Sequence, residues 1–154
     1  MSSLGSRQQL DLNIPLHELL YEVFSSTLER KDLPCLQKLK VKIRDFQPIE
    51  PNCFTIQQKR ALCQFLEEAL CNVGKHAVNV TRLSAVGKHL QGYYTLSVKD
   101  NGAGITSTQE NRGTKQCREI AKLLGGEFKR ESLEPKGTLC ELTWRLKSRK
   151  LTCI

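Results

Sequence analysis

The chain has 154 residues and a formal net charge of +8 at pH 7, and hydrophobic residues make up 39% of it. These values are typical of one globular domain with a real core, and they exclude a disordered chain. No apolar run approaches the roughly 20 residues that span a bilayer, and the N-terminal MSSLGSRQQ lacks the apolar core of a signal peptide, so we expect a cytoplasmic domain without direct membrane contact.

The basic residues raise nucleic acid as a partner, but no aromatic residues alternate with them as a base-stacking surface requires. They recur in short groups, most of which we interpret as ordinary solvated faces: Lys38 to Arg44, Lys59 with Arg60, Lys129 with Arg130, and Lys147 to Lys150. We therefore expect no nucleic-acid partner. The seven cysteines include no CxxC pair, which predicts reduced, mostly buried thiols instead of disulfides or a zinc site.

The first predicted element is a helix over residues 13–28, with Asn13 as a candidate cap and Pro15 in the first turn. Its apolar residues recur with a helical period, which predicts docking on the same domain or on a partner helix. Residues 38–46 alternate cationic and apolar side chains, as a half-exposed strand does. A turn-rich stretch over 47–54 then leads to the central helix.

The central helix is predicted over Leu62–Ala77 and has two different faces. One face is apolar and is expected in the core; it consists of Leu62, Leu66, Ala69, Val73 and Ala77. The other carries Gln64, Glu68, Asn72 and Lys75, which are surface neighbours at helical spacing. An acid and an amide one turn apart, with a cation beyond them, can hold Mg²⁺ and an attached polyphosphate. The simpler interpretation is a solvated helix face.

The second half of the chain is predicted to be mostly strands. Strands are expected at 78–86 and 93–99, joined by a connection over 87–92, and again at 127–132 and 138–146. A helix over 114–124 precedes the last two and should end at Gly125 and Gly126 in a left-handed cap. This order predicts an α+β fold, a two-layer α/β sandwich whose mixed, mostly antiparallel sheet carries helices on one face.

The stretch DNGAGI, from Asp100 to Ile105, follows a predicted strand directly. Gly102 and Gly104 allow a flat or phosphorylated ligand to approach the backbone. Asp100 offers an acceptor to an amino group such as that of adenine, and the neighbouring sequence suggests no structural partner for it. Taken alone, such a turn is more often a hairpin.

Four segments together carry a resemblance: EEALCNVGKHA, DNGAGI, RGTKQCREIAKLLGGEF and KGTLCELTW. In order and spacing they resemble the nucleotide-binding module of sensor histidine kinases, in the superfamily shared with gyrase and MutL. The match covers residues 38–146, is most similar to the branch with the motif EALxNxxKHA, and its CELTW ending is similar to that of cyanobacterial kinases. The resemblance implies a Bergerat-type ATPase fold over residues 35–147, between an N-terminal helix and lead-in (1–34) and a basic tail (148–154).

The resemblance implies roles for the central helix, with ATP and Mg²⁺ as cofactors. Glu68 would orient or deprotonate the group that attacks the γ-phosphate. Asn72 would give its side-chain oxygen to Mg²⁺, which needs few protein ligands because it keeps several waters. Lys75 would lie along the phosphates and His76 beside the nucleotide.

The resemblance also implies a base site and a phosphate site. Asp100 would accept the adenine amino hydrogen and Thr138 would complete that contact through water, while Gly102, Gly104 and Ile105 form the turn beside the adenine. Gly113 and Thr114, at the start of the next helix, would hold phosphates through unpaired N–H groups and the positive end of the helix dipole.

Two departures from the family pattern limit these expectations. Gln116 stands where a second glycine is usual, and the lid over 106–112 is short. No phosphoacceptor box is recognisable, and His17, followed by Glu18, is interpreted as a surface histidine of the first helix. The expected acceptor is therefore a histidine on a separate dimerisation domain of a parent kinase. A response regulator is the expected indirect partner, and a membrane anchor in the parent kinase is compatible with this interpretation.

Two other functions compete with phosphotransfer. The first is a degenerate nucleotide-binding module that regulates partners without transferring phosphate, which the change at Gln116 favours. The second is ATP hydrolysis of the gyrase or MutL type, which is less favoured because the chain has no room for their longer lid and transducer elements. Retention of Glu68 and Asn72 favours the kinase.

Overall fold

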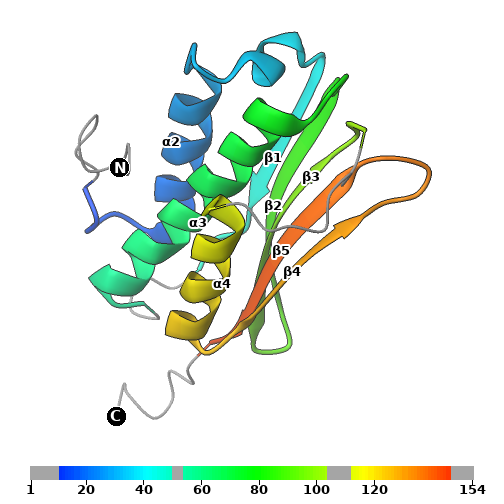
Figure 1. The fold of residues 1–154 in the computed structure, drawn as a ribbon. Coiled ribbons are helices and arrows are strands. Elements are labelled where there is room, and N and C mark those ends of the chain that lie inside the picture. Colours follow the sequence, from blue (N-terminus) through cyan, green and yellow to red (C-terminus); the bar gives the residue numbers. More distant parts are fainter. Residues whose placement is uncertain (1–10, 50–53, 104–111, 147–154) are drawn as a thin grey trace, which may run out of the picture.

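The computed structural model describes residues 11–49, 54–103 and 112–146. Its five-stranded sheet has the order β1-β2-β3-β5-β4, and the helices lie on one face of it (Figure 1). β1 runs parallel to β2, and the other three pairings are antiparallel. This confirms the predicted two-layer α+β sandwich. In chain order the elements are α2 (Leu16–Leu28), η1 (Pro34–Lys38), β1 (Val41–Phe46), α3 (Ile56–His76), β2 (Arg82–Leu90), β3 (Tyr93–Asp100), α4 (Arg112–Leu124), β4 (Glu127–Ser132) and β5 (Thr138–Arg145).

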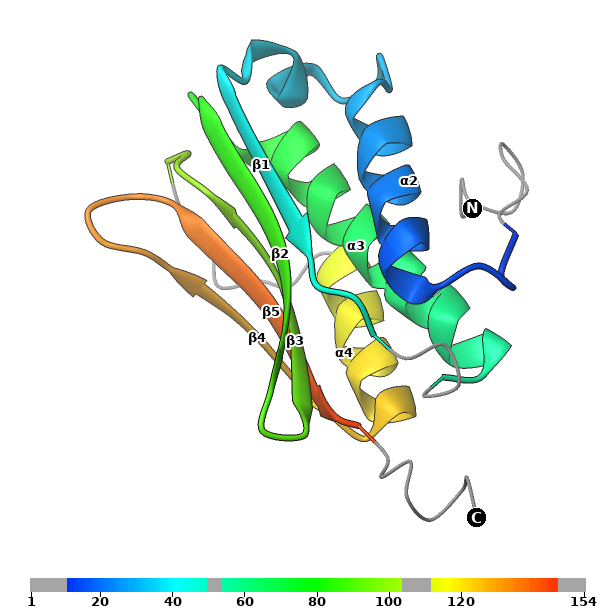
Figure 2. The same cartoon turned by 180° about the vertical axis from the view of Figure 1, so that it is seen from behind.

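One hydrophobic core fills the space between the helices and the sheet. Seen from behind, no helix of the described ranges covers the other face of the sheet (Figure 2). The apolar stripe of α2 belongs to this core, with Leu19, Leu20 and Val23 fully buried. The prediction that this stripe docks on its own domain is confirmed. None of the helices in the described ranges is long and apolar enough to cross a membrane.

The start of α2 differs from the predicted asparagine cap. Pro15 occupies the cap position and no side chain caps the helix, so the prediction for Asn13 is wrong. The backbone N–H of Asn13 instead donates to the carboxylate of Asp11 at 3.0 Å, within the turn that precedes the helix. His17 lies in the first turn of this helix, as predicted, and is half-buried.

Lys59 connects the lead-in of the chain to α3. The residue is buried, and its ammonium group donates to the backbone carbonyls of Leu12 and Ile14 at 3.1 Å each. The interpretation of Lys59 as part of a solvated face is therefore wrong, whereas the neighbouring Arg60 is exposed as expected.

β2 begins and ends later than the sequence predicted. The chain first turns over residues 77–81, where Asn79 has a φ of 63°, and the side chain of Asn101 accepts from the N–H groups of Thr81 and Arg82 at 2.9 Å each. Gly87 lies inside β2, where a Cβ atom would stand 2.1 Å from the hydroxyl oxygen of Tyr94. The glycine therefore allows this close approach within the strand and does not mark the predicted connection.

The other predicted features of the second half agree with the structure. Gly125 has a φ of +67°, and the N–H of Gly126 bonds to the carbonyl of Ala121 at 2.8 Å, which confirms the left-handed cap of α4. The described cysteines are all free thiols, as predicted; Cys63, Cys71, Cys117 and Cys140 are buried and Cys35 is half-buried. Cys53 and Cys153 lie outside the described residues.

Candidate functional site

α3 carries the polar face that the sequence singled out. The helix begins with a capping box in which Thr55 accepts from the N–H of Gln58 and the Gln58 side chain accepts from the N–H of Thr55, each at 3.0 Å. Its apolar arc is buried except at Ala77, which is half-buried and caps the helix. Along the polar arc, Gln64, Glu68 and Asn72 are half-buried and Lys75 is exposed. The burial pattern therefore separates the two faces as the helical period predicted.

The end of β3 meets the start of β5 next to the C-terminal end of α3. The strand register pairs Asp100 with Thr138, and the next inward-facing pair is Val98 with Cys140. Asp100 is only 7% exposed, and its carboxylate accepts from the N–H of Gly102 at 2.7 Å. The carboxylate thus has a structural partner that the sequence did not suggest. This bond fixes the turn that begins the DNGAGI segment.

A pocket lies between α3 and the sheet at this point. Its walls come from α3, β3, β4 and β5, and its lining residues are Ala69, Asn72, Val73, His76, Ala77, Val98, Asp100, Arg130, Thr138 and Cys140. Four of the residues singled out in the sequence, Asn72, His76, Asp100 and Thr138, therefore meet at one pocket. The α3 side offers an amide and an imidazole, and the sheet side offers a carboxylate and a hydroxyl.

The charge state of Asp100 results from opposing effects. Burial raises the pKa of its carboxyl above 3.8, whereas the hydrogen bond from Gly102 and the positive charge of Arg130 lower it. Burial likewise raises the pKa of the Cys140 thiol to about 11, against the lowering effect of Arg130. At neutral pH the thiol is therefore a weakly polar part of the pocket wall.

The remaining predicted residues lie around this pocket or outside the described ranges. Glu68 and Lys75 share α3 with Asn72 but do not line the pocket. Thr114 is buried in the first turn of α4, and Gly113 precedes it in that turn. Gly104 and Ile105 lie outside the described residues, as does the predicted lid except for Arg112, the first residue of α4.

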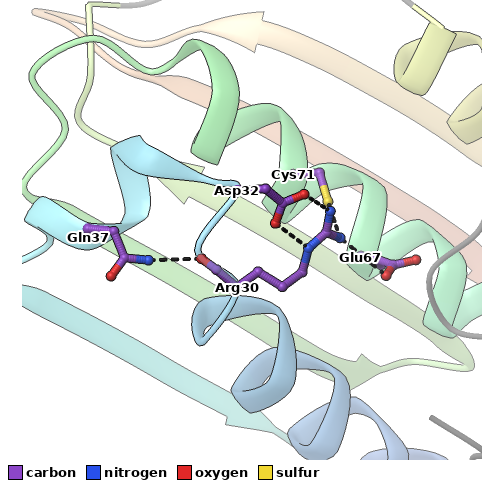
Figure 3. Close-up of polar contacts among 5 residues, drawn as sticks. All are labelled: Arg30, Asp32, Gln37, Glu67 and Cys71. Carbon is purple, nitrogen blue, oxygen red and sulfur yellow. Dashed lines mark hydrogen bonds and ion pairs between the residues drawn. The ribbon is translucent and has the colours of Figure 1, made fainter. Parts of the chain in front are cut away.

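Two consecutive acids of α3 occupy different environments. Figure 3 shows Glu67 directed toward Arg30, whose guanidinium also contacts Asp32 and Cys71. The closest nitrogen–oxygen distances are 3.6 Å to Glu67 and 2.6 Å to Asp32, and the pKa of Arg30 is raised, chiefly by the bond to Asp32. Glu68 is half-buried on the polar arc of the helix, one turn before Asn72. Glu67 is therefore held in an ion pair, whereas Glu68 lies on the same arc as the pocket residue Asn72.

Arg130 is the pocket residue that the sequence analysis missed. It lies on β4, where its neighbours Lys129 and Glu131 are exposed. The signal was present, because a strand alternates its side chains between two faces and Phe128, two residues earlier, is apolar. An inward-facing arginine was overlooked because charged residues are ordinarily assigned to the surface.

No group of three or more histidine, cysteine, aspartate or glutamate side chains in the described ranges is arranged to hold a metal ion. A magnesium site that uses one amide oxygen together with ligand phosphates and water would not form such a group. Asn72, whose side chain carries such an oxygen, lines the pocket.

Comparison with solved structures identifies the fold as that of histidine kinase catalytic domains. The chain is similar to the kinase domain of a blue-light-activated histidine kinase from Erythrobacter litoralis, with 19% identity and a TM-score of 0.70 over 90% of this chain and 68% of that one. The histidine kinase AdeS of Acinetobacter baumannii is 19% identical, with a TM-score of 0.67 over 95% of this chain and 74% of that one. The catalytic domain of the histidine kinase ThkA is 16% identical, with a TM-score of 0.61 over 86% of this chain and 94% of that one.

At these identities the likeness shows the fold alone. No family model matches the sequence, and no curated protein matches it. The similarity to the EALxNxxKHA branch and to cyanobacterial kinases stays a prediction.

Proposed function

We propose that the chain is the ATP-binding catalytic module of a two-component sensor histidine kinase. In this function it transfers the γ-phosphate of ATP to a histidine on a separate dimerisation domain, from which a response regulator later receives it. The observation that carries the proposal is the pocket in which Asn72, His76, Asp100 and Thr138 meet from three different elements. The motifs that supply them are distant in sequence, and the fold is that of histidine kinase catalytic domains.

We assign the base end of the nucleotide to the sheet side of the pocket, where Asp100 and Thr138 lie. Asp100 provides a buried acceptor for an exocyclic amino group, and the hydroxyl of Thr138 lies on the paired strand. A buried carboxylate that meets a matching donor gains a charge-assisted hydrogen bond, and one that meets a mismatched group leaves a polar atom unsatisfied. The difference in free energy between these two cases favours a base with an amino group over a base without one. Gly102 holds the carboxylate in place through its N–H, and the resemblance assigns Gly104 and Ile105, which lie outside the described residues, to the base site.

The phosphate end would follow the polar face of α3 toward α4. The amide oxygen of Asn72 is a hard donor suited to Mg²⁺, and the exposed ammonium of Lys75 adds positive charge along the same helix. The N–H groups of Gly113 and Thr114 lie in the first turn of α4, where helical N–H groups lack intrahelical acceptors and favour anions. Bound ATP supplies the phosphoryl group.

Glu68 is assigned the acid–base role. It is one turn from Asn72 on the half-buried face of α3, and its carboxylate is not engaged in the ion pair that holds Glu67. A carboxylate there orients the attacking group or takes its proton. Such positioned groups contribute about 10² to 10⁴ in rate.

A nucleotide-binding regulatory module without phosphotransfer is the second candidate. The observation in its favour is Gln116, half-buried in α4 where the family pattern has a glycine. Such a module would bind ATP and change its partner contacts but transfer nothing.

Two measurements on the purified chain separate these functions. The first is a titration with a fluorescent ATP analogue, with and without Mg²⁺; binding that strengthens with Mg²⁺ is expected for both. The second is transfer of labelled phosphate to a separately supplied dimerisation domain, which is expected for the kinase only. Absence of nucleotide binding would refute both candidates, and binding without transfer to any supplied acceptor would favour the regulatory module.

A further inference from the structure

Arg130 lines the pocket from β4, and the strand register shows which residues lie next to it. It pairs with Cys140 on β5, which in turn pairs with Val98 on β3, and all three residues line the pocket. The next row toward the strand ends contains Ser132, Thr138 and Asp100. Arg130 and Asp100 therefore lie on the helix-facing side of the sheet, one row apart and with β5 between them.

The guanidinium of Arg130 acts on the groups at the base end of the pocket. Its charge lowers the pKa values of the Asp100 carboxyl and the Cys140 thiol, although burial raises both. Its Nε is buried and has no hydrogen-bond partner among the described residues. A buried donor without an acceptor is unfavourable, so this nitrogen is suited to an acceptor that enters with a ligand.

The two charged groups match the edge of an adenine base. The amino group of adenine is flanked by two ring nitrogens, N1 and N7, which only accept hydrogen bonds. A guanidinium only donates, through five N–H groups, and a carboxylate only accepts. A base that gives its amino hydrogen to Asp100 thus presents a ring acceptor next to it, toward the neighbouring row of the sheet.

We infer that Arg130 contacts the bound base, donating a hydrogen bond to the ring nitrogen beside the amino group that Asp100 accepts, and so helps to select adenine. This inference rests on the proposed function, since it requires that the pocket binds ATP. It assigns Arg130 to the base and not to the phosphates. The phosphates are assigned to Asn72, Lys75 and the first turn of α4.

The test compares ATP with two analogues in which a C–H group replaces N1 or N7. Affinities are measured for the parent chain and for Arg130→Met, which keeps an apolar side chain of similar length. For the parent we expect one of the analogues to bind about tenfold more weakly than ATP, the loss of one charge-assisted hydrogen bond. For Arg130→Met we expect ATP to bind about tenfold more weakly and that analogue to suffer no further loss.

Lys129→Met is the matched control. Lys129 precedes Arg130 on β4 but is 55% exposed and pairs with Glu131 and Glu141, so the substitution removes the same charge from the opposite face. We expect this variant to discriminate between ATP and the analogue as the parent does. If Arg130→Met does not fold, Arg130→Lys replaces it, and the discrimination should fall at least about threefold because an ammonium lacks the planar fork.

The outcomes that overturn the inference differ from those that overturn the proposed function. A parent chain that binds no ATP refutes the proposed function. A parent chain that binds ATP, and binds each analogue as tightly as ATP, refutes the inference alone. It is also refuted if Arg130→Met weakens ATP and both analogues by one common factor, since Arg130 would then act on the phosphates or on the fold.

Discussion

At the residue scale, Asp100 shows how burial and hydrogen bonding oppose each other at the candidate site. The carboxylate is buried, which disfavours its charge, yet the Gly102 N–H and the charge of Arg130 stabilise that charge. The residue therefore costs stability in the folded chain while offering a strong acceptor to a ligand. Stability and binding should respond in opposite directions when its charge is removed.

The first prediction concerns Asp100→Asn. An amide keeps the volume and can still accept from Gly102, but it presents a donor to the adenine amino group whenever it rotates. We expect nucleotide affinity to fall by about 1 to 3 kcal/mol, roughly a 5- to 150-fold loss, measured by titration with a fluorescent ATP analogue. Unchanged affinity in a folded variant would show that the adenine assignment is wrong.

The same variant has a predicted pH dependence of stability. The folded-state pKa of Asp100 lies above 3.8, so its carboxyl binds a proton more strongly in the folded chain than in the unfolded one. This contribution to stability is fully present below about pH 3.8 and is lost as the pH rises through the folded-state pKa. The melting temperature of the parent, minus that of Asp100→Asn, should therefore decrease from acidic to neutral pH. A difference that stays constant or increases would contradict the prediction.

The second prediction separates the two consecutive acids of α3. Glu68→Gln is nearly isosteric and keeps the helix propensity, so folding and nucleotide affinity should be retained while phosphotransfer falls by about 10² to 10⁴. Glu67→Gln should instead lower the free energy of unfolding by about 1 to 3 kcal/mol, because it weakens a buried contact to Arg30. Its nucleotide affinity should not change.

The measurements for this pair are thermal unfolding, nucleotide affinity and transfer to a supplied acceptor domain. Asn72→Ala is a third comparison and should reduce Mg²⁺-dependent affinity as well as transfer, since it removes a metal ligand. If Glu68→Gln transfers phosphate normally, or if Glu68→Gln and Asn72→Ala fail only by unfolding, the polar arc of α3 is a solvated face.

At the element scale, the third prediction concerns the attachment of the lead-in to α3. Lys59→Met keeps the apolar stem but leaves the carbonyls of Leu12 and Ile14 without their donor. We expect the free energy of unfolding to decrease by about 1 to 3 kcal/mol, measured by chemical denaturation. Arg60→Met, at the exposed neighbouring position, is the control and should change it by less than about 0.5 kcal/mol. Equal effects of the two substitutions would refute the role of Lys59.

The elements that the sequence predicted correctly are those whose pattern is local. The two faces of α3 follow from a helical period, and the end of α4 follows from paired glycines. The elements predicted less well depend on distant partners. The start of β2 depends on the side chain of Asn101, and the strand position of Gly87 depends on the ring of Tyr94. Neither partner is visible from the segment itself.

The same distinction applies to the candidate site. Asn72, His76, Asp100 and Thr138 belong to recognisable motifs, and the fold brings them to one pocket. Lys59 and Arg130 were assigned to solvent because an isolated charge in a sequence is usually exposed. Lys59 is instead buried against carbonyls of the lead-in, and Arg130 is half-buried at the pocket that it shares with a carboxylate two strands away. No local pattern specifies such partners.

At the scale of the whole molecule, the positions of the histidines bear on whether the chain can phosphorylate itself. His76 lines the pocket from the last turn of α3, and the proposed function assigns it to the nucleotide. His17 is half-buried in the first turn of α2, whose stripe is packed in the core. His89 is exposed near the end of β2, away from the β3 end that forms the pocket. If ATP binds as proposed, with its phosphates along α3, we expect none of the three to be the phosphoacceptor.

The last prediction is therefore that the purified chain does not phosphorylate itself, although it transfers phosphate to an added domain. After incubation with labelled ATP and Mg²⁺, we expect no acid-labile phosphate on His17, His76 or His89. Addition of a dimerisation domain that carries a phosphoacceptor histidine should produce label on that domain only. Glu68→Gln should slow this labelling by about 10² to 10⁴, because the attacking imidazole then lacks its orienting carboxylate. Stable label on His17 would place the acceptor within this chain and would refute transfer to a separate domain as its function.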